Sequence, residues 1–189
     1  ANESIQQLFY YYMFYIRALE KDTKSTTPGV RKYYSSNKFE RLYQSELLDN
    51  LFVMLELWKV INKGEVLEDE SWSSNIKIKQ TLDTLTSYPN EFWKYPVIIY
   101  YICYRKDKNF EDKFARFLNK LLAELMTKYI LIPTINAVKG DILKLNSAIV
   151  VSDIPKFDFK ELDQAQLEAG IQNPHRNVVR MLLKTLAYK

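Results

Sequence analysis

Few side chains in this 189-residue chain could carry catalysis. It has one histidine, His175, and one cysteine, Cys103. A thiolate zinc site needs several such ligands, and a histidine-dependent triad would have only His175 as its base. The four glycines stand alone at positions 29, 64, 140 and 170, whereas a phosphate-binding loop needs them clustered. These patterns exclude a P-loop, a dinucleotide fingerprint and a thiolate zinc site, and they predict no cofactor.

Two pairs of carboxylates are the remaining candidates for metal-dependent chemistry, Glu111 with Asp112 and Glu161 with Asp163. A metal nuclease needs carboxylates that converge in a cleft. Each pair instead has lysine neighbours in an amphipathic pattern, which is typical of solvated helix faces. His175 follows an Asn-Pro pair and is expected to be a solvated residue of a first helical turn. We therefore predict no catalytic residue and no metal ligand.

Basic residues give the positive signal. Between Thr23 and Phe39 the chain has four cations and no acid, interleaved with Tyr33 and Tyr34 and several hydroxyl side chains. Cations with exposed aromatics suit phosphate contact and base stacking; the alternative is a solvated, flexible loop. The candidate nucleic-acid-binding residues of this segment are Lys24, Arg31, Lys32 and Lys38.

A second basic group lies within the last predicted helix. Arg176, Arg180 and Lys184 recur there every four residues, and no acid follows Glu168. We expect this stripe to oppose an apolar face of Val179, Leu182, Leu183 and Leu186. Three cations could neutralise only a few phosphates, and a merely solvated face is the alternative. A third stripe, Lys106, Lys113, Arg116 and Lys120, is diluted by Glu111, Asp112 and Glu124, and we set it aside.

The composition bounds what could position these residues. The chain is 47% hydrophobic and 26% charged, as in folded globular proteins. Four glycines and six prolines favour long helices with short connections. The net charge of +4 does not by itself demand a polyanionic partner. A lone cysteine and apolar runs too short to cross a bilayer predict a soluble, cytoplasmic protein without a membrane partner.

Apolar residues recur at helical spacing along nearly the whole chain. We expect helices over about 3–20, 38–63, 71–86, 97–104, 109–133, 135–151, 159–169 and 173–189, with loops at 21–37 and 152–158. Ser71, Asn109, Asp158 and the Asn173-Pro174 pair are the expected helix starts, and Gly64 and Gly170 the expected ends. This predicts an all-α fold, a single bundle of roughly eight helices without a significant sheet. The side chains expected to be buried are Trp58, Ile98, Ile99, Cys103, Phe117, Leu121 and Leu182.

The chain opens at Ala1 within an aromatic helical pattern and stops at Lys189 while another pattern is still running. We therefore expect residues 1–189 to form a single helical domain cut from a longer protein.

Four stretches together resemble one family: LFYYYMFYIRAL (8–19), YPNEFWKYPVIIYY (88–101), YILIPTINAVKGDIL (129–143) and NPHRNVVRMLLKTLAYK (173–189). They are similar to the helical region of GmrSD-type bacterial restriction proteins. In that family a ParB/sulfiredoxin-like nucleotidase module precedes the helical region and an HNH nuclease module follows it. The Asp-Gly-Gln-Gln-Arg signature of the nucleotidase and the paired His and Asn residues of the nuclease have no counterpart here.

The resemblance implies a non-catalytic module of a cytoplasmic defence protein. Its partners would be the flanking nucleotidase and nuclease modules of the same chain, which it would link, and its cations could hold DNA backbone. The main alternative is a protein–protein interaction or oligomerisation module whose exposed tyrosines make the contact. The nucleotide, the DNA modification recognised and the oligomeric state stay open.

Overall fold

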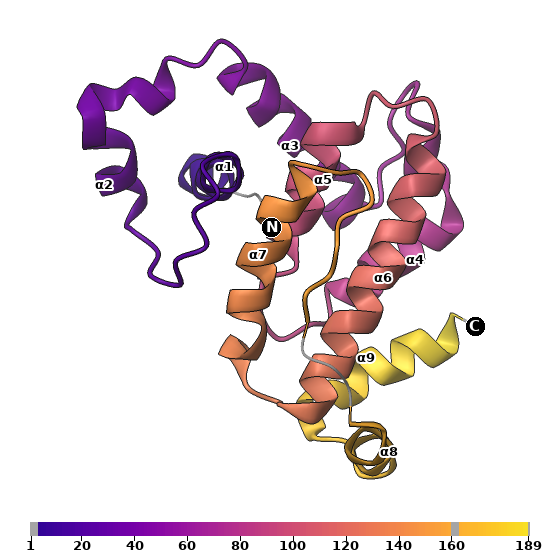
Figure 1. The fold of residues 1–189 in the computed structure, drawn as a ribbon. Helices are drawn as coiled ribbons and strands as arrows, with labels where there is room; N and C mark the ends of the chain where they lie inside the picture. Colours follow the sequence, from indigo (N-terminus) through magenta and orange to yellow (C-terminus); the bar gives the residue numbers. More distant parts are fainter. Residues whose placement is uncertain (1–3, 160–162, 189) are drawn as a thin grey trace.

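The computed structural model describes residues 4–159 and 163–188, and within these ranges every regular element is a helix (Figure 1). The prediction of an all-α fold without a sheet is confirmed. The α-helices are α1 (Ile5–Leu19), α2 (Val30–Ser35), α3 (Leu47–Lys63), α4 (Ile76–Leu85), α5 (Lys94–Tyr104), α6 (Phe110–Leu131), α7 (Lys139–Ile149), α8 (Gln164–Gln172) and α9 (Arg176–Ala187). Short 3-10 segments lie at η1 (Ser36–Leu42), η2 (Ser71–Ser74) and η3 (Ile135–Val138).

Helix α5 lies at the centre of the bundle, in contact with α1, α3, α6 and α7 (Figure 1). Every residue from Lys94 to Ile102 is buried, as the run of apolar residues on all sides of this helix predicts. Pro96 falls in the first turn, where its missing N–H costs no hydrogen bond. The helix is thus enclosed by these four neighbours.

Stacked aromatic rings join α5 to its neighbours. The Phe14 ring of α1 lies parallel to Tyr95 at 3.9 Å, and the Phe117 ring of α6 lies against Tyr100 at 4.1 Å. Such contacts add to the free energy gained by burying the rings. Five of the seven side chains expected in the core are buried, and the other two, Cys103 and Leu182, are half-buried.

Helix α6 is the long element against which α4, α8 and α9 all pack. It begins after Asn109, as predicted, although that side chain makes no capping hydrogen bond. It ends at Leu131, two residues before Pro133, which cannot continue a helix. No helix in the described ranges is long and apolar enough to span a membrane.

The segment from Lys21 to Leu42, here called the arm, differs from prediction. Residues 21–37 were expected to form a loop and 38–63 a helix, but α2 and η1 occupy 30–42 and α3 starts only at Leu47. Long-range contacts order the arm: Tyr34 donates to the carbonyl of Phe9, and Arg41 pairs with Glu20 at 3.1 Å. Periodicity along the chain carries no signal for such contacts.

Three helix starts were also placed wrongly. Helix α4 is capped by Asn75 rather than Ser71, α8 by Asp163 rather than Asp158, and α9 by His175 rather than the preceding Asn-Pro pair. Each observed cap accepts a hydrogen bond from a backbone N–H of the first turn. Asp158 instead faces Lys144 at 3.3 Å. Glu161 lies outside the described residues.

Two glycines define local geometry at helix ends and contacts. Gly64 ends α3 in the left-handed region with φ of 65°, as predicted. Gly170 was expected to end a helix but lies inside α8, where it faces Ile130 of α6. A Cβ atom at that position would stand 2.6 Å from Cγ2 of Ile130, so the close approach of α8 to α6 depends on glycine.

Candidate functional site

The arm is fixed to α1 by Arg17, whose side chain is only 1% exposed. Its Nε donates to Oδ2 of Asp22 at 2.8 Å, and its Nη2 donates to the carbonyl of Lys24 at 2.5 Å. Partial burial alone would raise the pKa of Asp22, but the hydrogen bond from Arg17 brings it below its usual value. The backbone at Lys24 is therefore held in place while the Lys24 side chain remains exposed.

The four candidate cations of the arm all lie in solvent: Lys24, Arg31, Lys32 and Lys38 are exposed. Tyr33 and Tyr34, between them, are buried at 7% and 5% exposure. The expectation that these two rings are exposed for base stacking is therefore wrong, because Tyr34 makes an edge contact with Phe9 and the Arg41 guanidinium covers the Tyr33 ring. The exposed cations and hydroxyl groups of the arm have the chemistry of phosphate contact, and Phe39 is 48% exposed beside Lys38.

The three cations of the basic stripe on α9 lie in different environments. Arg176 and Arg180 are exposed, but the Lys184 ammonium lies 2.7 Å from Oδ2 of Asp83 in α4. The same ammonium also donates to the backbone carbonyl of Asp83 at 3.1 Å. Lys184 thus holds α9 to α4, and its assignment to nucleic-acid contact is not supported by this geometry.

The apolar face of α9 was also misplaced. Val178 and Met181 point inward and are fully buried, whereas Leu183 and Leu186, expected to be inward, are 61% and 63% exposed. Thr185 donates its hydroxyl to the carbonyl of Met181 and lies 3.8 Å from the sulfur of Met126 in α6. Val179 and Leu182 of the predicted face are half-buried, so only Leu183 and Leu186 lie on the surface.

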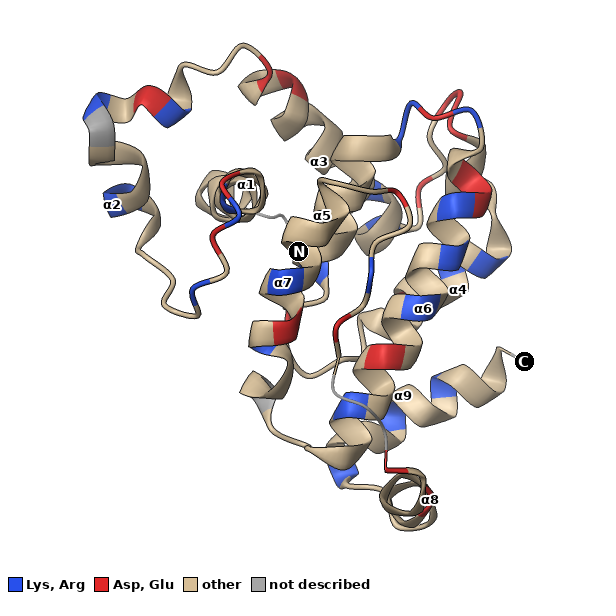
Figure 2. Cartoon of the chain, viewed as in Figure 1, with Lys and Arg blue, Asp and Glu red and all other residues tan. Residues whose placement is uncertain are grey.

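The two predicted groups do not form one site. The arm lies beyond α1 on one side of the bundle, and α9 crosses the foot of α6 on the other (Figure 2). Lys and Arg positions also gather on α6 and α4, above α9 in the view of Figure 2. This third region contains the stripe that the sequence analysis set aside.

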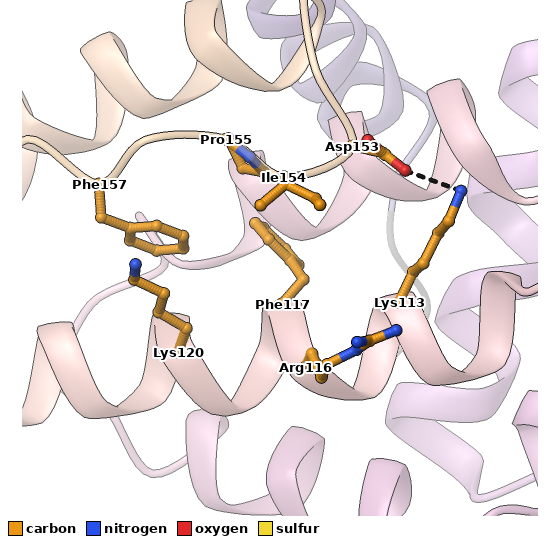
Figure 3. A pocket seen from close by; sticks show the side chains of 8 residues that line it. All are labelled: Lys113, Arg116, Phe117, Lys120, Asp153, Ile154, Pro155 and Phe157. Carbon is orange, nitrogen blue, oxygen red and sulfur yellow. Dashed lines mark ion pairs between the residues drawn. The ribbon is translucent and has the colours of Figure 1, made fainter.

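A hollow of about 210 Å³ lies between α6 and the segment 153–157 (Figure 3). Phe117, Pro155 and Phe157 form its apolar interior, with Ile154 at the mouth. Its complete lining is Lys113, Arg116, Phe117, Lys120, Asp153, Ile154, Pro155 and Phe157.

One end of the hollow is closed by an ion pair. Lys113 lies 2.7 Å from Asp153 and 2.8 Å from Asp107, so two carboxylates share its charge. Hydrogen bonds from Lys113 lower the pKa of Asp153, which therefore stays ionised and bound to that lysine. The Tyr100 hydroxyl donates to the carbonyl of Asp153 at 2.9 Å and fixes the start of the segment.

The other rim carries two exposed cations, Arg116 and Lys120, one helical turn apart. Arg116 donates its Nε to the carbonyl of Asp112 at 3.2 Å, and Lys120 lies 5.0 Å from the Phe157 ring. Within residues 4–159 and 163–188 neither is in an ion pair. The hollow thus combines an apolar interior with uncompensated positive charge.

The sequence argues against this stripe because Glu111, Asp112 and Glu124 lie beside it, and in the structure one of these acids, Glu111, is engaged elsewhere. Glu111 turns away and accepts hydrogen bonds from Ser71 at 2.5 Å and Asn75 at 2.6 Å. Those bonds hold the pKa of Glu111 below its usual value. The useful signal was the placement of Phe117 between two cations four residues apart.

The other chemically competent groups serve local structure. His175 and Asp163 cap helices, and burial raises the pKa of the Cys103 thiol to about 11. Among the described residues no group of three or more His, Cys, Asp or Glu side chains could hold a metal ion.

Comparison with protein-family models, with curated proteins and with solved structures found no match to this chain. The resemblance to GmrSD-type helical regions therefore rests on the four stretches of sequence alone.

Proposed function

We propose that this chain is a non-catalytic helical module that contacts the phosphate backbone of nucleic acid. In keeping with the family resemblance, it would link a nucleotide-dependent module to an HNH nuclease in a cytoplasmic restriction protein. The observation that carries the proposal is the arm, which presents Arg31 and Lys32 on a short helix held rigidly against α1. Cations on a fixed scaffold lose less conformational freedom on binding than cations on a flexible loop.

Charge and burial together support phosphate contact over base recognition. The arm cations are exposed while Tyr33 and Tyr34 are buried, so these two rings offer no face on which a base could stack. Contacts of this kind fix a protein on nucleic acid without reading its sequence. Binding should therefore be weak, indifferent to sequence and strongly dependent on salt.

An interaction module is the second candidate, and the exposed apolar residues favour it. Leu183 and Leu186 of α9 are more than 60% exposed, as are Leu48 and Phe52 of α3. Apolar residues grouped on helix surfaces are typical of protein interfaces. This role would show as self-association that depends on protein concentration, without nucleic-acid binding.

The test is fluorescence anisotropy of a labelled DNA duplex titrated with the chain over a series of salt concentrations. We expect measurable binding at low salt and a linear fall of log K with log salt. The variant Arg31→Ala with Lys32→Ala should reduce the salt slope by about two units, since each cation that meets a phosphate contributes about one.

The matched control is Lys59→Ala with Lys63→Ala, which removes the same charge from exposed positions on α3. An equal loss in both variants would show that net charge alone is responsible. Absence of duplex binding at low salt would reject the proposal and leave the interaction module in its place.

A further inference from the structure

The hollow between α6 and segment 153–157 has features that the arm lacks. Its interior is apolar and includes the Phe157 ring, while Arg116 and Lys120 stand on its rim (Figure 3). Three cations and one carboxylate line it, and that carboxylate, Asp153, is already held by Lys113. The net positive charge is therefore concentrated beside the apolar interior.

We propose that this hollow takes one unstacked base of a single-stranded nucleic acid, with Arg116 and Lys120 meeting the phosphates on either side of that nucleotide. The inference rests on the proposed function, because it assigns to the same module a second contact with nucleic acid. Single-strand sites combine these two elements, an apolar or aromatic surface for the base and cations for the backbone.

The dimensions agree with a single base. The volume of about 210 Å³ lies below the roughly 300–1,000 Å³ of pockets for drug-sized ligands, so the hollow accommodates one ring system. Arg116 and Lys120 are separated by four residues, which places them about 6 Å apart along the α6 axis. Two cations at that spacing flank one nucleotide rather than a longer stretch.

The walls are rigid enough to form a site before binding. Pro155 is buried, and the Phe117 ring is fixed by its stack on Tyr100 at 4.1 Å. The ion pair of Lys113 with Asp153 ties the segment to α6 at one end. The Phe157 ring, half-buried at 6.0 Å from Phe117, closes the other.

A duplex cannot use this hollow unless a base leaves the stack, so the experiment compares strands. Labelled oligo(dT) and a duplex of equal length are titrated with the chain at one low salt concentration. Ile154→Glu introduces a negative charge at the mouth, on a side chain that is 82% exposed and so tolerates replacement. We expect it to weaken oligo(dT) binding by about tenfold, with less than a twofold effect on the duplex.

Val151→Glu is the matched control, because Val151 is 72% exposed on the same stretch of chain but does not line the hollow. It should change oligo(dT) binding less than twofold. Arg116→Ala with Lys120→Ala should weaken oligo(dT) binding at least as much as Ile154→Glu, and circular dichroism would verify that each variant is folded.

A free nucleotide could bring the same base and phosphate chemistry, so thymidine monophosphate is added as a competitor. Displacement of oligo(dT) only by millimolar nucleotide supports a strand site, whereas displacement by micromolar nucleotide would replace it with a small-molecule site. Equal effects of Ile154→Glu and Val151→Glu on oligo(dT) affinity would reject the hollow as a base-binding site. The proposal that the arm binds duplex would be unaffected. Tighter binding of an acidic, phenylalanine-containing peptide than of oligo(dT) would also overturn it.

Discussion

The ammonium group of Lys184 lies 2.7 Å from Oδ2 of Asp83, and the Tyr188 hydroxyl donates to the same oxygen at 2.6 Å. Two residues near the end of α9 thus meet one carboxylate of α4, more than 100 positions earlier in the chain. A basic residue that sequence reasoning assigned to a polyanion is committed to the fold.

Asp83→Asn should loosen α9. Burial alone would raise the pKa of Asp83, but the hydrogen bonds from Lys184 and Tyr188 hold it below its usual value. The carboxylate is partly exposed, so we expect a loss of about 0.5–1 kcal/mol in the free energy of unfolding. The contribution of a group with a lowered folded pKa is present above its unfolded pKa of about 3.9 and disappears as the pH falls through the folded value.

Urea denaturation of the wild type and Asp83→Asn at neutral pH and near pH 3 measures this dependence. The difference between them should shrink at the lower pH, and α9 amides of the variant should exchange faster at neutral pH. Glu68→Gln, an exposed carboxylate without an ion pair among the described residues, is the control and should change little. A difference that grows toward acid would contradict the assignment.

The stack of Phe14 on Tyr95 predicts that replacing Phe14 by alanine destabilises the fold strongly, whereas replacing the exposed Phe52 does so only slightly. Phe14 is 2% exposed and Phe52 is 64% exposed. Phe14→Ala should cost about 3–5 kcal/mol because it leaves a cavity between α1 and α5. Phe52→Ala should stay within about 0.5 kcal/mol. Denaturant midpoints of the two variants decide this, and similar losses would mean that the exposed face of α3 is covered in solution.

The parts of the fold that could be predicted are those that follow a helical period. The burial of α5 and of the inward stripe of α6 can be predicted locally, because the spacing of apolar residues along a helix indicates which side chains face the core. Phe117 and Leu121 were therefore placed in the core correctly.

The parts that could not be predicted depend on long-range contacts. The Tyr34 hydroxyl of the arm donates to the carbonyl of Phe9, and the Arg41 guanidinium covers the Tyr33 ring. The hollow is formed by an irregular segment with no period, brought to α6 by the pair of Asp153 with Lys113. A hydrogen bond across 25 residues or an ion pair across 40 leaves no pattern in a single sequence.

The many buried tyrosines predict instability in alkali. Burial, the largest cause in each case, raises the pKa of two buried and two half-buried tyrosines to about 12, and the unfolded value is about 10. These four are Tyr11, Tyr15, Tyr33 and Tyr104. A group whose folded pKa is raised contributes stability that is complete below the unfolded pKa and is lost as the pH rises through the folded value.

Stability should therefore fall steeply between about pH 10 and pH 12. The ultraviolet absorbance of tyrosinate, followed together with circular dichroism, tests this. Most of the tyrosines should ionise only as the helices unfold, while in concentrated denaturant they should all titrate near pH 10. Full ionisation with the helices intact would contradict the burial of these hydroxyls.

Two glycines in helices should respond oppositely to alanine. In the described part of the chain no atom lies within 4 Å of the place that a Cβ on Gly140 of α7 would take, whereas a Cβ on Gly170 of α8 would stand 2.6 Å from Cγ2 of Ile130. Gly140→Ala should raise the free energy of unfolding by about 0.5–1 kcal/mol, because alanine loses less backbone entropy in a helix. Gly170→Ala brings the same entropic gain but forces α8 away from α6 or shifts Ile130, at a cost of about 1–3 kcal/mol. The thermal denaturation midpoint should therefore move in opposite directions for the two variants.

The double variant Gly170→Ala with Ile130→Ala removes the clashing Cγ2 atom, and it should lose less stability than the sum of the two single variants. Stabilisation by Gly170→Ala alone would show that α8 is not packed on α6 through this glycine.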